Sequence, residues 1–164
     1  MEEGFRLLLQ QYQERLYWHI RRLVIQHDDT NDVLQNVLIK VYRNIHNFEG
    51  KAQLYTWLYR IATNETLTFL NKKKKKNAIS LEQEITSLAD TLKADDYFDG
   101  SAVQLKLQQA ILSLPEKQKL IFSMRYFEGL PYKEIAIILE TSVGGLKASY
   151  HHAVKKIEAF VKEI

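Results

Sequence analysis

The sequence contains no cysteine, so disulfide bonds and thiolate metal sites are excluded and a reducing compartment is the expected location. Only 2 prolines and 6 glycines interrupt its 164 residues, which leaves long stretches free to form helices. No stretch reaches the roughly 20 apolar residues that a membrane-spanning helix needs. The acidic N-terminus also lacks the apolar segment of a secretory signal. We therefore expect an all-α, cytoplasmic protein with no direct membrane insertion.

Sequence patterns of catalysis are also missing. The chain has no glycine-rich phosphate loop, no nucleophile elbow and no His/Glu spacing of a metalloenzyme. The neighbours His151 and His152 are poorly placed for a metal, because adjacent helical side chains point about 100° apart and no acidic or cysteine partner is close in sequence. We predict no catalytic residue, no metal site and no cofactor.

Apolar residues recur at three- and four-residue steps before residue 76, which predicts three amphipathic helices. Asp29 or Thr30 is expected to cap the second of these helices, and the third runs into the lysines from Lys72 to Lys76. The expected inward residues are Phe5, Leu8, Leu9, Tyr12, Leu16, Ile20 and Leu23, then Val33, Leu34, Val37, Val41, Tyr42 and Ile45, then Leu54, Trp57, Leu58, Ile61, Ala62 and Leu67.

The segment 77–102 is acidic and has little periodicity, so we interpret it as a linker between two small domains, 1–76 and 103–164. Helical periodicity returns from Val103. Pro115 is expected at the first position of a helix that stops at Gly129, and Pro131 at the start of a short helix. Thr141 or Ser142 is expected to cap the last helix.

The last two predicted helices form a candidate helix-turn-helix. Ile135, Ala136 and Leu139 would pack against apolar positions of the final helix, and that helix would present a basic outer face to the DNA major groove. The residues of this face are Lys147, Ser149, His151, His152 and Lys155. An ordinary helical hairpin with a solvated basic face would give the same pattern.

The lysine run also has two interpretations. Charge blocks after a helix are usually solvated, but five lysines downstream of Tyr55, Trp57 and Tyr59 would suit a single-strand site in which phosphates are neutralised and bases stack on rings. The apolar neighbours of Trp57 favour a place in the core. The run and the separate helix-turn-helix together favour nucleic-acid binding.

Two blocks of the sequence resemble the extracytoplasmic-function (ECF) sigma factors of the sigma-70 superfamily. The first block is FEG at 48–50 with LYTWLYRIATN at 54–64, which resembles the family's F-x-G and TWLYRIA-x-N. The second is LPE at 114–116, EGLPYKEIA at 128–136 and SVGGLK at 142–147, which is similar to LPE, EGLSYEEIA and SVGTVKS. The likeness covers nearly the whole chain in the same order.

The resemblance implies a sigma factor that binds core RNA polymerase through its beta-prime and beta subunits and directs promoter-specific transcription initiation. It implies that residues 1–76, sigma region 2, melt the −10 element and that residues 103–164, sigma region 4, read the −35 duplex. It places Asp32, Gln35, Asn36 and Ile39 at polymerase-binding positions, and Lys51, Tyr55, Asn64, Lys72 and Lys73 at the −10 DNA. An anti-sigma factor, in many members a membrane-bound one, is the further partner that the resemblance implies.

The same resemblance places the basic outer face of the last helix, from Lys147 to Lys155, on the −35 DNA. Four positions depart from the family pattern. Asn36 stands where an acidic residue is usual, Gly145 where threonine is, Ala148 where serine is and His152 where arginine is. We expect one or two charged contacts to the polymerase to be weaker or replaced by amide contacts, and the −35 affinity to be lower or dependent on pH.

Two other classes of protein remain as alternatives. A one-component regulator would carry only the helix-turn-helix, would normally dimerise and would not need the polar face around Asp32. An RNA-binding protein would use the lysines and aromatic residues but would leave the second half of the chain unexplained.

Overall fold

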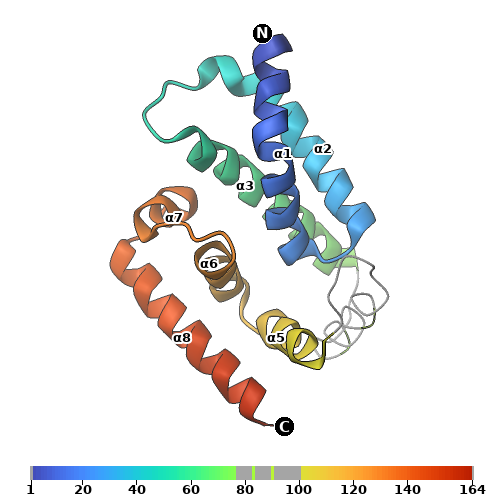
Figure 1. The fold of residues 1–164 in the computed structure, drawn as a ribbon, viewed down its shortest axis with the longest axis vertical. Helices are drawn as coiled ribbons and strands as arrows, with labels where there is room; N and C mark the ends of the chain where they lie inside the picture. Colours follow the sequence, from blue (N-terminus) through green and yellow to red (C-terminus); the bar gives the residue numbers. More distant parts are fainter. Residues whose placement is uncertain (1, 77–82, 84–89, 91–100, 164) are drawn as a thin grey trace. The chain divides into compact units, whose positions relative to one another are not determined.

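The computed structural model describes residues 2–76, 83, 90 and 101–163, and the ordered elements of this part are all helical, which confirms the predicted all-α class (Figure 1). The described residues up to Lys76 form one compact unit, and most of those from Ser101 onward form a second. Most of the predicted linker 77–102 lies outside the described residues. None of the described helices is long and apolar enough to cross a membrane.

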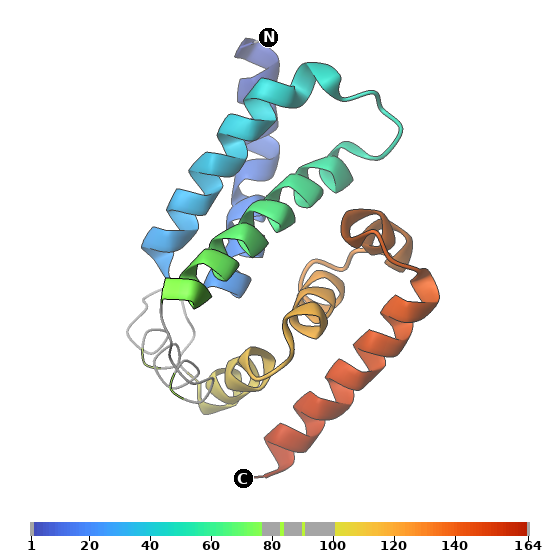
Figure 2. The same cartoon turned by 180° about the vertical axis from the view of Figure 1, so that it is seen from behind.

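The first unit is a three-helix bundle. Its elements are α1 (Glu2–Val24), α2 (His27–Asn44), the short 3-10 helix η1 (Ile45–Asn47) and α3 (Leu54–Lys76), and each α-helix packs against the other two. Figure 2 shows the bundle from the side on which α2 and α3 face the viewer. Its core consists of Leu8, Leu16, Ile20, Val24, Val33, Leu34, Val37, Val41, Leu58 and Ala62.

The turn between α1 and α2 is tighter than predicted. Helix α2 already begins at His27 after Gln26, so the predicted caps Asp29 and Thr30 are wrong. Thr30 instead donates its hydroxyl hydrogen to the Gln26 carbonyl at 2.7 Å. The chain reverses because Ile25 adopts a φ of +75°, a conformation that a β-branched residue rarely takes and that the sequence does not signal. The Arg21 Nε donates to the Ile25 carbonyl at 2.7 Å and holds this turn.

Several residues predicted to point inward are only partly buried, and one of them is exposed. Tyr42 is 41% exposed, because it lies one position beyond the buried stripe that ends at Val41, and its ring packs edge-on against Phe5 at 5.1 Å. Leu67 is half-buried. Thr63, Thr66 and Tyr59 share the buried side of α3 instead.

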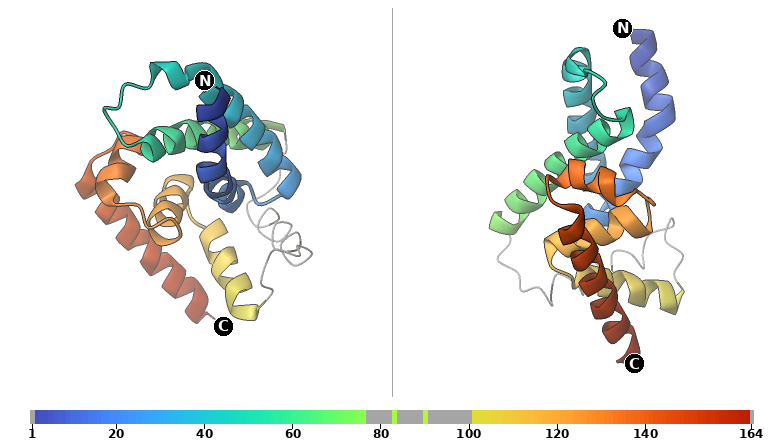
Figure 3. Two further views of the ribbon diagram at one scale, coloured as in Figure 1. Left: turned by 45° about the horizontal axis from the view of Figure 1, so that its top comes forward. Right: turned by 90° about the vertical axis from the view of Figure 1, so that its left-hand side faces the viewer.

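The described part of the second unit comprises α5 (Ala102–Leu112), α6 (Glu116–Tyr126), the first residues of α7 (Tyr132–Leu139) and α8 (Val143–Lys162). Helix α8 packs against α5 and α6, and both panels of Figure 3 show it running from the turn after α7 to the C-terminus. The core of this unit consists of Ala110, Ile111, Leu114, Phe122, Ala153 and Ile157.

The helix ends of the second unit follow standard capping chemistry, with one correction. Pro115 is the residue before α6 rather than its first residue, because its ψ of 148° is extended. Gly129 has a φ of +62°, which allows the turn after α6 at a position where other residues would be strained. Ser142 accepts a hydrogen bond from the Gly145 N–H at 3.1 Å, so Ser142 rather than Thr141 caps α8.

Candidate nucleic-acid interface

The solvent side of α2 brings together the four residues predicted to bind polymerase. Asp32, Gln35, Asn36 and Ile39 are all exposed, and their spacing of three and four residues puts them on one face. The opposite face of the same helix carries the buried Val33, Val37 and Val41. Ile39 is 49% exposed, so this face offers a protein partner an apolar centre within a polar surround.

The loop from Phe48 to Gln53 joins η1 to α3 and holds Lys51, the first of the predicted −10 residues. Gly50 has a φ of +73°, which the loop needs in order to turn. The Lys51 Nζ lies 2.6 Å from the Glu49 carboxylate, and both side chains are exposed. Tyr55 is half-buried at the start of α3, whereas Trp57 packs on the core and lies 5.4 Å from the Phe48 ring. The structure thus favours the core interpretation of Trp57 over the stacking one.

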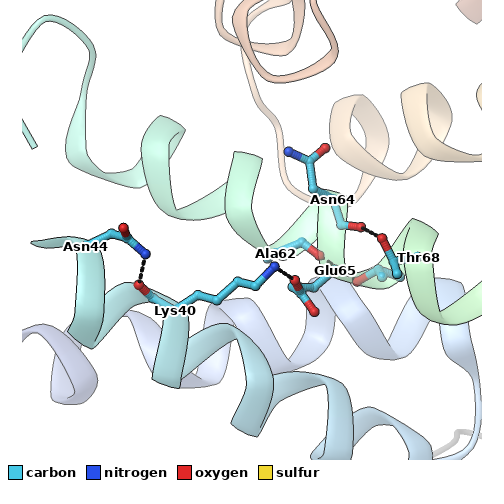
Figure 4. Close-up of polar contacts among 7 residues, drawn as sticks. Lys40, Asn44, Ala62, Asn64, Glu65 and Thr68 are labelled. Carbon is cyan, nitrogen blue, oxygen red and sulfur yellow. Dashed lines mark hydrogen bonds and ion pairs between the residues drawn. The ribbon is translucent and has the colours of Figure 1, made fainter. Parts of the chain in front are cut away.

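Asn64 lies on the exposed side of α3, and Figure 4 shows its amide pointing away from the α2 side of that helix. Within the described part of the chain the amide makes no hydrogen bond that would occupy it. Its neighbour Glu65 points the other way and forms an ion pair with Lys40 of α2 (Figure 4). The buried residues Leu58 and Ala62 fix the rotation of α3, and the ion pair of Glu65 with Lys40 lies on the α2 side of the helix, away from Asn64.

The lysine run continues α3 as a helix to Lys76. Positive charge at a helix C-terminus is favoured by the helix dipole. Lys72 is exposed, but the Lys73 Nζ lies 2.9 Å from the Asp29 carboxylate in a partly buried ion pair. Of the three lysines predicted at the −10 DNA, two therefore already have an anionic partner in the first unit, Lys51 in an exposed ion pair and Lys73 in a partly buried one.

The helix-turn-helix segment consists of α7, the turn Glu140–Ser142 and α8. Glu140 turns the chain with a φ of +53°. Along α8, the apolar Leu146, Ala153 and Ile157 are buried. Lys147, His151, His152 and Lys155 are exposed and Ser149 is half-buried, so the structure places the predicted −35 residues mainly on the solvent side. Val143 is apolar but 37% exposed, because it lies at the very start of the helix.

Aromatic rings lie next to the basic face of α8. The Lys147 Nζ lies 5.8 Å from the Tyr132 ring centroid, and the guanidinium of Arg125 lies 4.5 Å from the same centroid. Tyr150 stacks on Phe122 at 5.8 Å, and burial raises the pKa of the Tyr150 hydroxyl above its ordinary value. A phenol whose pKa is raised stays neutral near pH 7, as an ordinary tyrosine does, so Tyr150 adds no negative charge to this face.

His19 is a buried polar residue that the sequence analysis missed. Its Nε2 lies 2.9 Å from the Thr63 Oγ1 and its ring lies 4.8 Å from Tyr59. Burial lowers the pKa of His19 from 6.5 to about 3, and the positive charge of Arg22 contributes in the same direction. The signal in the sequence was its position between Leu16 and Ile20 on the inward stripe of α1.

The last two helices, joined by a short turn and with exposed basic residues on the second, have the arrangement of a helix-turn-helix DNA-binding protein. Two family models match the chain, "Sigma-70 region 2" at residues 8–76 and "Sigma-70, region 4" at residues 104–157. The ECF RNA polymerase sigma-E factor of Haemophilus influenzae is 30% identical over 96% of this chain and 87% of its own length. The chain therefore belongs to the ECF sigma factors of the sigma-70 family, and it directs promoter-specific transcription initiation.

Further relatives and solved structures agree with this family. The ECF sigma factor SigW of Bacillus subtilis is 27% identical over 99% of this chain and 91% of its own length. The sigma factor RpoE of Bartonella quintana, solved with the anti-sigma factor NepR, aligns with a TM-score of 0.75 at 19% identity over 98% of both chains. CnrH, solved with the cytosolic domain of CnrY, aligns with a TM-score of 0.73 at 16% identity over 99% of this chain and 90% of its own. Sigma factors are initiation factors rather than enzymes.

Proposed function

We propose that residues 1–76 bind core RNA polymerase and melt the −10 element, that residues 103–164 read the −35 duplex, and that residues 77–102 link the two activities. The protein would act in the cytoplasm and have no catalysis of its own. The observation that carries this proposal is the exposed face of α2 formed by Asp32, Gln35, Asn36 and Ile39. A regulator with only a helix-turn-helix would not need a second exposed protein-binding face on a separate unit.

In this proposal the loop after η1 and the exposed side of α3 hold the non-template strand. Tyr55 lies where the loop meets α3, and Asn64 lies more than two turns further along the same helix. Extraction of a base from the stack costs a few kcal/mol, so the site must return that energy through ring contacts and amide hydrogen bonds. Lys51 and Lys72 are exposed cations beside this path and suit the phosphates of the strand.

The exposed face of α8 would enter the major groove at the −35 element. Lys147 is near the start of the helix, where recognition helices contact base edges. A neutral imidazole can donate or accept a hydrogen bond, so His151 and His152 can contact a base edge without carrying charge. Lys155, one turn beyond His151, suits a phosphate.

We also infer an anti-sigma partner for this chain. The two structural neighbours were each solved with another protein bound, NepR in one case and the cytosolic domain of CnrY in the other. An inhibitor that covers the α2 face would keep this protein from polymerase, and no change within its own chain would be required.

The test is reconstitution of the purified chain with sigma-free core polymerase, with complex formation and promoter-dependent transcripts as readouts. Ile39→Asp should weaken core binding by at least tenfold, since it places a charge at the centre of the apolar contact. The matched control is Leu7→Asp, because Leu7 is 53% exposed on α1 and lies outside the proposed face; it should bind core normally. Failure of the native chain to bind core, together with dimeric binding to duplex DNA, would instead identify a one-component regulator.

A further inference from the structure

Three tyrosine rings surround the guanidinium of Arg15 in the first unit. The Arg15 Cζ lies 5.8 Å from the ring centroid of Tyr12, 6.0 Å from that of Tyr55 and 5.8 Å from that of Tyr59. Tyr12 belongs to α1, as does Arg15, and the other two tyrosines belong to α3. All three distances fall within the range of cation–π attraction, so the rings restrict where this flexible cation can lie.

The position of Arg15 follows from the way α1 and α3 pack. Successive turns of α1 contact successive turns of α3. Arg15 lies next to Tyr55 and Tyr59, and His19, one turn further along α1, lies next to Tyr59 and Thr63. The His19 end of this seam is buried, whereas Arg15 is exposed. Arg15 therefore lies at the open end of the seam, next to the first turn of α3.

The charge of Arg15 has no anionic partner in the described part of the chain. Tyrosine rings offer a guanidinium their π faces but leave its five N–H donors free for acceptors. Other cations of the same unit are paired, such as Arg6 with Glu3 at 2.7 Å and Lys73 with Asp29 at 2.9 Å. The guanidinium of Arg15 is thus restricted in position, accessible to solvent and free to donate its N–H groups. These three properties suit the binding of an anionic group from another molecule.

We propose that Arg15 extends the −10 site onto α1 and binds a backbone phosphate of the displaced single strand beside Tyr55. This inference rests on the proposed function, in which Tyr55 contacts that strand. The planar guanidinium of arginine can donate hydrogen bonds to two phosphate oxygens at once. The three tyrosine rings already restrict the position of the guanidinium, so less side-chain freedom is lost on binding. Tyr12 acts as a positioning residue for the guanidinium.

The experiment measures the affinity of the reconstituted holoenzyme for a fluorescent single-stranded oligonucleotide over a range of salt concentrations. The oligonucleotide carries the non-template −10 region of a promoter that the holoenzyme transcribes. Arg15→Gln should bind roughly tenfold more weakly, and the slope of log affinity against log salt should become shallower by about 0.7, as expected for one lost phosphate contact on a single strand. Arg15→Lys keeps the charge and should keep the slope.

Arg6→Gln is the matched control, because it removes the same charge from the same helix at a residue already paired with Glu3; affinity and slope should not change. A holoenzyme that binds the strand equally well with Arg15→Gln would overturn the inference and leave the proposed function intact. Weaker binding with an unchanged slope would also overturn it, since Arg15 would then only position Tyr55. If the native holoenzyme bound no such strand, the proposed function itself would fail, and the inference with it.

Discussion

His19 makes the stability of the first unit depend on pH. Its pKa is about 3 in the folded protein and 6.5 as an ordinary histidine, so the unfolded chain takes up a proton at a pH at which the folded chain does not. The contribution of neutral His19 to the free energy of unfolding is therefore complete above pH 6.5. It is lost progressively as the pH falls from 6.5 toward 3. At about 1.36 kcal/mol per pH unit, the loss between pH 6.5 and pH 5 is about 2 kcal/mol. That is a large part of the roughly 5–15 kcal/mol that stabilises a typical domain.

The assay is urea unfolding at pH 7.5 and pH 5, followed by tryptophan fluorescence. Both tryptophans of the chain, Trp18 and Trp57, belong to the first unit, so their emission reports on it selectively. His19→Gln keeps a polar group toward Thr63 without a titrating ring. The native chain should lose about 2 kcal/mol more than this variant between the two pH values. Equal losses in both proteins would refute the reasoning, because they would show that His19 takes up its proton in the folded state.

Three further predictions concern the DNA contacts and one helix cap. Asn64→Ala should reduce promoter opening in a permanganate footprint while core binding stays normal, because the Asn64 amide is exposed and α3 is held by buried residues such as Leu58 and Ala62. Lys147→Gln should weaken binding of −35 duplex in a fluorescence anisotropy titration by about 1–3 kcal/mol if it reads a base, and an equal loss on unrelated DNA would show a phosphate contact alone. Ser142→Ala should lower the free energy of unfolding of the second unit by about 1 kcal/mol, measured by circular dichroism in urea, because the Gly145 N–H loses its acceptor; Thr141→Ala should have little effect.

The helices could be predicted because their apolar residues repeat with the helical period, as in the stripe from Val33 to Val41 that the structure buries. The same pattern left Asp32 and Asn36 on the solvent face, so candidate contact residues on regular helices could be located as well. What could not be predicted depends on single backbone conformations. The left-handed φ of Ile25 moved the start of α2, and no local pattern marks an isoleucine for that conformation.

Contacts between residues far apart in sequence were the second limit. The ion pair of Lys73 with Asp29 joins residues 44 positions apart, and within a run of identical lysines the sequence cannot single out the one that reaches a carboxylate. His19 and Arg15 acquire their surroundings only when α1 packs against α3. Such ion pairs and such burial exist only once the bundle has packed. They determine whether a lysine or histidine contributes to the fold or remains exposed and available to a partner.

Each unit has a core built from its own helices, the first around Val37 and Leu58 and the second around Phe122 and Ala153. A substitution that empties one core need not unfold the other. Under the proposed function, a chain damaged only in the second core would retain the α2 face and still occupy polymerase while failing to read −35 DNA. Such variants would be dominant negative in a cell that also contains the intact protein, whereas variants damaged in the first core would be recessive.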